Sequence, residues 1–104
     1  MAQFAYLLRP CRPSLPFDAT PEEQVIIGAH FAYLKQHLAE GRIIFVGRCE
    51  DGTFGIAVYD AETEAQATEI MQGDPAVQAS VMSATLYPFR VALMRATEHP
   101  AAAD

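Results

Sequence analysis

The chain has 104 residues, 51% of them hydrophobic and 19% charged, with a formal net charge of -6 at pH 7. This composition indicates one globular domain and excludes disorder of the whole chain. An acidic chain with one lysine and no basic stripe is a poor ligand for nucleic acid, and no segment approaches the roughly 20 apolar residues of a membrane span. We therefore expect neither a nucleic-acid nor a membrane partner, and a cytoplasmic location.

The two cysteines, Cys11 and Cys49, are far apart in the sequence and belong to no CxxC or Cys/His spacing. This usage predicts no disulfide framework, no zinc site and no iron–sulfur cluster. We expect Cys49 to lie in the core on a strand and Cys11 to be exposed in a loop. Walker and GxGxxG motifs are also missing from the sequence, so no metal and no cofactor is predicted.

The first half of the chain predicts a strand, a loop and a long helix. Residues 2–8 form a short apolar run typical of a strand, and the proline-rich residues after it predict a loop. Thr20-Pro21-Glu22-Glu23 combines an N-cap, a first-turn proline and a capping-box glutamate, so a helix should start there and end at Gly41. The core stripe expected from helical spacing is Ile27, Phe31, Leu34 and Leu38.

The second half predicts a hairpin, two helical pieces and a last strand. Residues 42–49 and 53–59 are rich in strand formers and flank an Asp-Gly turn, so they should pair antiparallel. A helix over residues 62–72 should end at Gly73, and Asp74-Pro75 should start a short helical piece through residue 80. Residues 81–94 predict a strand broken near Pro88, and residues 96–104 a flexible C-terminal tail after a domain spanning 1–95.

The resulting order is strand, helix, strand, strand, helix, strand. It is typical of a ferredoxin-like βαββαβ sandwich, an α+β fold with both helices on one face of a four-stranded antiparallel sheet. Apolar residues occupy consecutive positions in residues 4–8 and 43–46, so both faces of the sheet should be dry. Helices cover only one face. We therefore expect a homodimer of the dimeric α/β-barrel type, in which a second copy covers the other face.

Histidines are the natural candidates for acid–base chemistry because imidazole titrates near neutral pH. His99 falls in the expected tail. In helical projection His30 and His37 lie on one line with Ile26 and Tyr33, beside the core stripe. His30 should thus sit at the rim of the helix–sheet interface, where it is either a site residue or an ordinary residue at the edge of the core. We expect His37 to face solvent or to interact with the helix dipole.

Asp74 is the carboxylate best suited to partner His30. Its purely structural role would be to cap the helix that starts at Pro75. In a catalytic role it would orient the imidazole and stabilise its protonated form, although 44 positions separate the two residues. The candidate substrate-binding residues are Tyr6, Tyr33 and Tyr59, for which packing in the core is the alternative.

Several segments together resemble a known family: GAHFAYL at 28–34, EGRIIFVG at 40–47, GDPAV at 73–77 and YPF at 87–89. In their order and spacing, over residues 2–93, they resemble the YciI-like (YCII-related) proteins. The resemblance implies a ferredoxin-type dimer similar to muconolactone isomerase. It also implies a candidate active site made of a helix histidine and an aspartate before proline, which match His30 and Asp74. The proline-rich first loop is longer than is usual in this family.

We therefore expect a small enzyme without a cofactor, in which His30 is the general acid or base on a small organic substrate and Asp74 fixes its tautomer. Lyase, isomerase or hydrolase chemistry would fit. The alternative is a non-catalytic dimeric module that binds a small ligand or a partner in the same cleft. A third possibility is a structural dimer without a ligand. A concave pocket beside His30 would separate the first two from the third.

Overall fold

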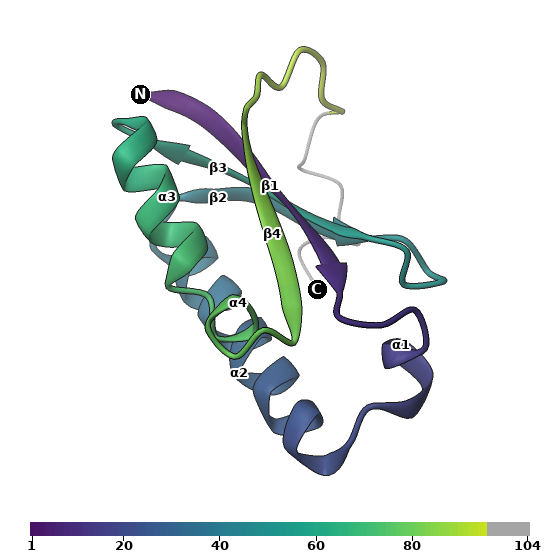
Figure 1. The fold of residues 1–104 in the computed structure, drawn as a ribbon. Helices are drawn as coiled ribbons and strands as arrows, with labels where there is room; N and C mark the ends of the chain where they lie inside the picture. Colours follow the sequence, from purple (N-terminus) through teal and green to yellow (C-terminus); the bar gives the residue numbers. More distant parts are fainter. Residues whose placement is uncertain (96–104) are drawn as a thin grey trace.

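The computed structural model describes residues 1–95, and the expected tail at 96–104, with His99, lies outside the described residues. In chain order the elements are β1 (Ala2–Pro10), α1 (Leu15–Asp18), α2 (Pro21–Ala39), β2 (Ile43–Arg48), β3 (Gly55–Ala61), α3 (Glu64–Gln72), α4 (Pro75–Gln78) and β4 (Met82–Pro88) (Figure 1). The strands form an antiparallel sheet in the order β2-β3-β1-β4. The predicted ferredoxin-like α+β fold is confirmed.

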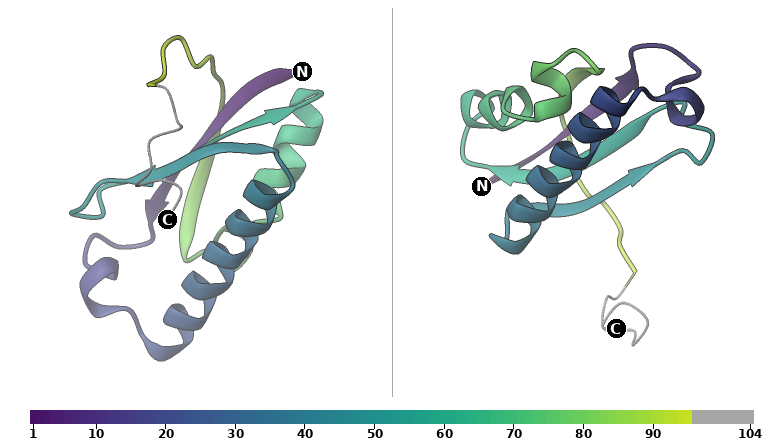
Figure 2. Two further views of the ribbon diagram at one scale, coloured as in Figure 1. Left: turned by 180° about the vertical axis from the view of Figure 1, so that it is seen from behind. Right: turned by 90° about the horizontal axis from the view of Figure 1, so that it is seen from below.

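The core lies between one face of the sheet and the helices α2, α3 and α4 (Figure 2). Phe4, Tyr6 and Leu8 alternate along β1 and point to this side, where they pack with Leu34 of α2 and Ala67 of α3. Within the described residues, no helix is both long enough and apolar enough to cross a membrane.

Helix α2 begins as predicted, but the face it buries differs from the expected stripe. The Thr20 hydroxyl accepts from the Glu23 backbone N–H and the Glu23 carboxylate accepts from the Thr20 N–H, which completes the capping box. His30 and Leu34 are buried on this helix, whereas Phe31 and Leu38 are each 54% exposed. The stripe prediction was wrong at these two positions, because the helix turns the line containing His30 toward the protein interior.

The proline-rich segment and the last strand also differ from prediction. Residues 15–18 form the short helix α1 inside the expected loop, and β1 continues to Pro10 because its partner Met82 extends the ladder. Strand β4 ends at Pro88, where the sequence predicts a break, and only the expected continuation over residues 89–94 was wrong. Proline has no N–H for the ladder, and after the Phe89 N–H bonds to the Gln3 carbonyl the chain leaves the sheet.

The second face of the sheet, called here the outer face, has an apolar centre. Ala5 and Val58 pair across β1 and β3 and are buried, and they point away from the helices. Around them lie Leu7, Phe45, Ile56 and Tyr87, which the strand register places on the same side. Phe45 and Tyr87 are 41% and 49% exposed. The outer face is therefore apolar at its centre, as the sequence pattern predicts.

Candidate active site

The structure brings His30 and Asp74 into direct contact. The His30 Nδ1 atom lies 2.8 Å from both Oδ1 and Oδ2 of Asp74. His30 comes from the middle of α2 and Asp74 is the N-cap of α4, so the packing of these two helices closes a gap of 44 positions in the sequence. Asp74 is 0% exposed and His30 9%. Asp74 is therefore held away from bulk water, and His30 keeps only a small exposed area.

Asp74 fulfils its structural and its pairing role at the same time. Its Oδ1 accepts from the Ala76 backbone N–H at 3.0 Å, which caps α4. Its Oδ2 accepts from the Tyr6 hydroxyl at 2.8 Å. With the His30 ring, the carboxylate thus has donors from α2, from β1 and from the backbone of α4. A buried carboxylate needs such donors to offset the loss of hydration, so three partners fix its position.

The hydrogen bond to Asp74 also determines which nitrogen of His30 is available. A carboxylate only accepts, so Nδ1 carries the proton and Nε2 of the neutral ring has a free lone pair. Within residues 1–95, Nε2 has no hydrogen-bond partner. Every buried side-chain nitrogen or oxygen in this part of the chain does have a partner, so Nε2 is not a buried atom and solvent reaches it. A histidine in this state can take a proton from a bound molecule and return it.

His30 lines a cavity of about 740 Å³ between α2, the end of β1, the β2–β3 hairpin and the α1 segment. This volume lies within the roughly 300–1,000 Å³ typical of small-molecule sites. The walls are mainly apolar and include Leu8, Leu15, Phe17, Ile27, Phe54 and Met82. The pocket that the sequence analysis required beside His30 is therefore present.

The chain matches a known protein family over most of its length. The family model of the YCII-related domain matches residues 2–90. The chain belongs to the YCII-related domain family. The suspected family is thus confirmed over nearly all of the described residues. No curated protein is similar enough to the chain to count as a match.

One solved structure with the same fold is the 5-chloro-2-hydroxyhydroquinone dehydrochlorinase TftG from Burkholderia phenoliruptrix AC1100, in complex with 2,5-dihydroxybenzoquinone. The TM-score is 0.61, and the alignment covers 84% of this chain and 93% of that chain. The two sequences are 20% identical. At that identity the likeness to TftG establishes the fold of the YCII-related domain and leaves its chemistry to the site itself.

The three tyrosines predicted to bind substrate lie outside the lining of the cavity of this YCII-related domain. Tyr6 donates to Asp74, Tyr33 donates to the Ile70 carbonyl at 2.7 Å, and Tyr59 donates to the Ala67 carbonyl at 2.6 Å. Burial, together with the neighbouring Asp74 carboxylate, raises the pKa of the Tyr6 hydroxyl, which therefore stays a donor. The aromatic lining of the cavity comes instead from Phe17, Phe31 and Phe54.

His37 lies outside the cavity lining and does not face solvent freely. Its Nδ1 accepts from Arg42 Nε at 2.8 Å, and its ring packs edge-on against Tyr33 with the centroids 4.5 Å apart. Burial and the Arg42 charge lower the pKa of His37. His37 lies in the last turn of α2 and is partly exposed, and the Arg42 side chain, which the sequence did not indicate as a partner, binds its ring.

The cysteines and possible metal ligands take no part in the site. Cys11 is exposed, as expected, and Cys49 is only partly buried; both are free thiols. In the part of the chain that the structure describes, no three His, Cys, Asp or Glu side chains come close enough together to hold a metal ion.

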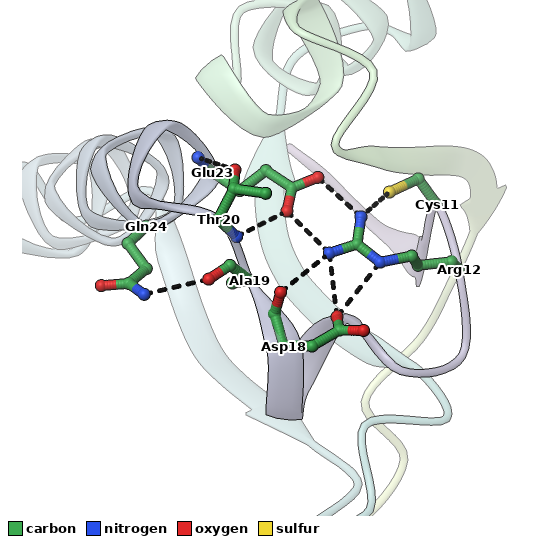
Figure 3. A network of polar contacts seen from close by, with 7 residues as sticks. All are labelled: Cys11, Arg12, Asp18, Ala19, Thr20, Glu23 and Gln24. Atoms are coloured by element: carbon green, nitrogen blue, oxygen red, sulfur yellow. Dashed lines mark hydrogen bonds and ion pairs between the residues drawn. The ribbon is translucent and has the colours of Figure 1, made fainter.

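One wall of the cavity is the segment of residues 11–19, called here the strap, which sequence reasoning assigned to a plain loop. Arg12 connects the strap to α2: its Nη1 and Nη2 bind the two Glu23 carboxylate oxygens at 2.7 and 2.8 Å (Figure 3). Its Nη2 also binds Asp18 Oδ1 at 2.9 Å. The Arg12 hydrogen bonds, with the Thr20 N–H, lower the pKa of Glu23 to about 2.

The strap also meets the β2–β3 hairpin at the mouth of the cavity. Gly52 has a φ of +80° at the tip of the hairpin, in the left-handed region that favours glycine. A Cβ at this position would collide with the Pro16 ring. The backbone of the hairpin therefore packs directly on the strap. The signal for this contact was present in the sequence as the Asp-Gly turn, but its partner lies 36 positions earlier.

Proposed function

We propose that this YCII-related domain is a small enzyme that moves a proton on a small organic substrate. His30 is the general acid or base, and Asp74 positions it. One observation carries the proposal: the Nδ1 of a buried histidine is bound by a fully buried carboxylate, while its Nε2 opens to an apolar cavity. This is the arrangement that proton transfer to a bound molecule requires.

The reaction class follows from what the site contains. Proton transfer between His30 Nε2 and a substrate carbon or oxygen needs no cofactor. The fold relative TftG is, by its name, a dehydrochlorinase, and loss of HCl includes removal of a proton. Eliminations and isomerisations of small cyclic compounds are therefore the first reactions to test. The apolar cavity supports a substrate with a hydrocarbon or aromatic body.

The test is turnover of a panel of chlorinated hydroquinones, hydroxyquinones and unsaturated lactones, followed by absorbance and by chloride release. We expect His30→Gln and His30→Ala to lower kcat/KM by about 10²–10⁴-fold, the usual contribution of a general acid or base. His37→Gln is the matched control, because its ring lies outside the cavity lining. Circular dichroism and thermal unfolding would verify that each variant is folded.

Two results would contradict the proposal. One is a substrate whose turnover is unchanged in folded His30→Gln. The other is a ligand that binds the cavity tightly and is released unaltered by the wild-type protein under all conditions tested. The second result would favour the alternative that we derived from the sequence, a non-catalytic module that binds a small ligand.

We also propose that a second copy of the chain covers the outer face of the sheet. Phe45 and Tyr87 are large, partly exposed side chains beside the buried Ala5 and Val58, and apolar patches of this kind are typical of interfaces between subunits. Sedimentation at micromolar concentration should give a dimer, and Phe45→Glu with Tyr87→Glu should give a monomer. A wild-type monomer would rule out this assembly.

The cytoplasmic location expected from the sequence remains part of the proposal. Cys11 and Cys49 are both unpaired, which is the usual state of cysteines in a reducing compartment. Fractionation of cells that produce the full chain tests it, with recovery in the membrane or secreted fraction as the contradicting result.

A further inference from the structure

The cavity has a charge that does not match the rest of the protein. The chain has 13 acidic and 7 basic residues, not counting histidine. Among the residues that line the cavity, however, there is no aspartate and no glutamate, and Arg48 is the only arginine or lysine. Arg48 lines the cavity and is also exposed to solvent, so a ligand that enters can reach its guanidinium. The formal charge of the lining is therefore positive, in a protein whose formal net charge is -6.

Arg48 projects from the same face of the sheet as the core. It is the last residue of β2 and pairs with Gly55 of β3. A Cβ built on Gly55 would lie 3.7 Å from the Arg48 Cβ and 3.9 Å from the Leu8 Cβ, which places these two side chains on one side. Since Gly55 has no side chain, the space between the Arg48 stem and Leu8 stays open to the cavity.

The guanidinium of Arg48 has donors to spare. Within residues 1–95 its only side-chain hydrogen bond runs from Nη1 to the Cys49 carbonyl at 3.5 Å, and it makes no ion pair. The other arginines near the site differ: Arg12 binds two carboxylates and Arg42 pairs with Glu40. A guanidinium has five N–H donors, arranged to bind two anionic oxygens at once.

We propose that the cavity binds a small cyclic organic anion, with its carboxylate or phenolate oxygen on Arg48 and its ring among the apolar walls. This inference names the substrate class of the proposed enzyme and so rests on the proposed function. Arg48 on β2 and His30 on α2 both line the cavity, so the anionic group and the reacting atom occupy different parts of one bound molecule. Arg48 is the residue that selects anions over neutral analogues of equal shape.

The experiment measures binding without turnover, by calorimetry or by NMR titration. Two matched pairs serve as probes: benzoate against benzamide, and 4-nitrophenolate against nitrobenzene. We expect wild-type protein to bind the anion of at least one pair about tenfold or more tightly than the neutral partner. Whichever pair shows the preference distinguishes a carboxylate ligand from a phenolate ligand.

Three variants test whether Arg48 causes the preference for anions: Arg48→Ala, Arg48→Lys and Arg90→Ala. Arg48→Ala should weaken binding of the anion about tenfold or more and leave the neutral partner unchanged, and Arg48→Lys should restore part of the loss. Arg90 is exposed and absent from the cavity lining, so Arg90→Ala should bind like wild type. Equal affinity for anion and neutral partner, no binding of any anion at millimolar concentration, or an anion preference that survives Arg48→Ala would overturn the inference.

This result is separable from that of the proposed function. His30→Gln should abolish turnover and keep the preference for anions, because Arg48 is unchanged. An anion preference without any catalysis would leave the inference in place and defeat the enzyme proposal. Catalysis that depends on His30 but not on Arg48 would support the enzyme proposal and overturn the inference about Arg48.

Discussion

The protein contains two hydrogen-bond networks built around carboxylates, and they differ in their burial. Asp74 is fully buried and accepts from His30, Tyr6 and the Ala76 N–H. Glu23 is partly exposed, with 18% of its side chain accessible, and accepts from Arg12 and from the Thr20 N–H (Figure 3). The distances are similar, but Glu23 is bound by a charged guanidinium and Asp74 by a hydroxyl, an imidazole and a backbone N–H. The two networks therefore differ in burial and in the charge of the donor.

Burial makes the Asp74 network costly to break, and exposure makes the Arg12 network easy to open. An unpaired charge in the interior loses hydration with no compensation, whereas an exposed carboxylate regains water when its partner leaves. Both networks border the same cavity, one through His30 and the other through the strap. The cavity thus has one wall fixed by buried contacts and one wall held by contacts that solvent can replace.

The largest expected effect comes from Asp74→Ala. This change leaves the Tyr6 hydroxyl and the His30 Nδ1–H without their acceptor in the interior. We expect the free energy of unfolding to fall by about 3–5 kcal/mol, because two buried donors lose their acceptor at about 1–3 kcal/mol each and α4 loses its cap at about 1 kcal/mol. Urea denaturation measures it, with Asp60→Ala on β3 as a control expected to change stability by about 0.5 kcal/mol. If both variants lose the same amount, the loss does not come from the buried hydrogen bonds of Asp74.

A smaller effect is expected from Tyr6→Phe, because Asp74 keeps His30 and the Ala76 N–H as partners. Loss of one buried hydrogen bond should lower the free energy of unfolding by about 1–3 kcal/mol. Tyr6 is a positioning residue outside the cavity lining, so we expect kcat to fall with little change in KM. Tyr33→Phe, which removes a hydrogen bond to the Ile70 carbonyl, should leave kcat unchanged. An effect of Tyr6→Phe on KM alone would contradict this role.

Arg12→Ala should change binding more than stability. The variant releases the strap from Glu23 of α2 and removes the ion pair with Asp18 inside the strap, and water replaces these partly exposed contacts. We expect KM, or the Kd of a bound anion, to rise severalfold while kcat and the urea midpoint stay close to wild type. Raising the salt concentration should produce a weaker version of the same change in the wild-type protein. A large loss of stability would show that the strap network behaves like the buried one.

The smallest effect is the pH dependence of Glu23. Its pKa is about 2 in the folded protein against an ordinary value of 4.5, so the stability it contributes is complete above pH 4.5. That contribution is lost as the pH falls from about 4.5 toward about 2. In thermal unfolding over this range, wild type should lose more Tm than Glu23→Gln, whose amide keeps the capping geometry without the charge. If the Tm of wild type and the Tm of Glu23→Gln fall equally over this pH range, the Glu23 charge does not contribute to stability.

The elements that the sequence predicts well are those fixed by neighbouring residues. Thr20 to Glu23 form a capping box, Asp74 caps the helix that starts at Pro75, and Gly52 ends an Asp-Gly turn. Each depends on contacts within a few positions, so local pattern is sufficient. The βαββαβ order followed from these signals, and the fold followed from the order.

The rest depends on contacts between distant residues. Helical periodicity alone assigned Phe31 and Leu38 to the core, but the helix rotates to bring the polar His30 to Asp74. The pairing of His30 with Asp74 was a candidate from residue type, and the family resemblance supported it, because no local pattern joins the two residues. The tyrosines looked suitable for a pocket because a sequence does not show which hydroxyls bind groups inside the protein, as Tyr6 binds Asp74 and Tyr33 and Tyr59 bind backbone carbonyls. The strap was missed because Arg12 reaches two carboxylates that no local pattern joins to it, Asp18 in the same segment and Glu23 on α2.

The contact between Gly52 and the Pro16 ring links two loops that are far apart in the sequence. Each loop shapes the mouth of the cavity, so neither can change length or bulk without a matching change in the other. If only one of these loops is replaced by the loop of a relative, the two loops should no longer pack together. If both loops are replaced by those of the same relative, the protein should remain functional. Libraries that aim to alter the ligand preference of this fold should therefore diversify the two segments as one unit.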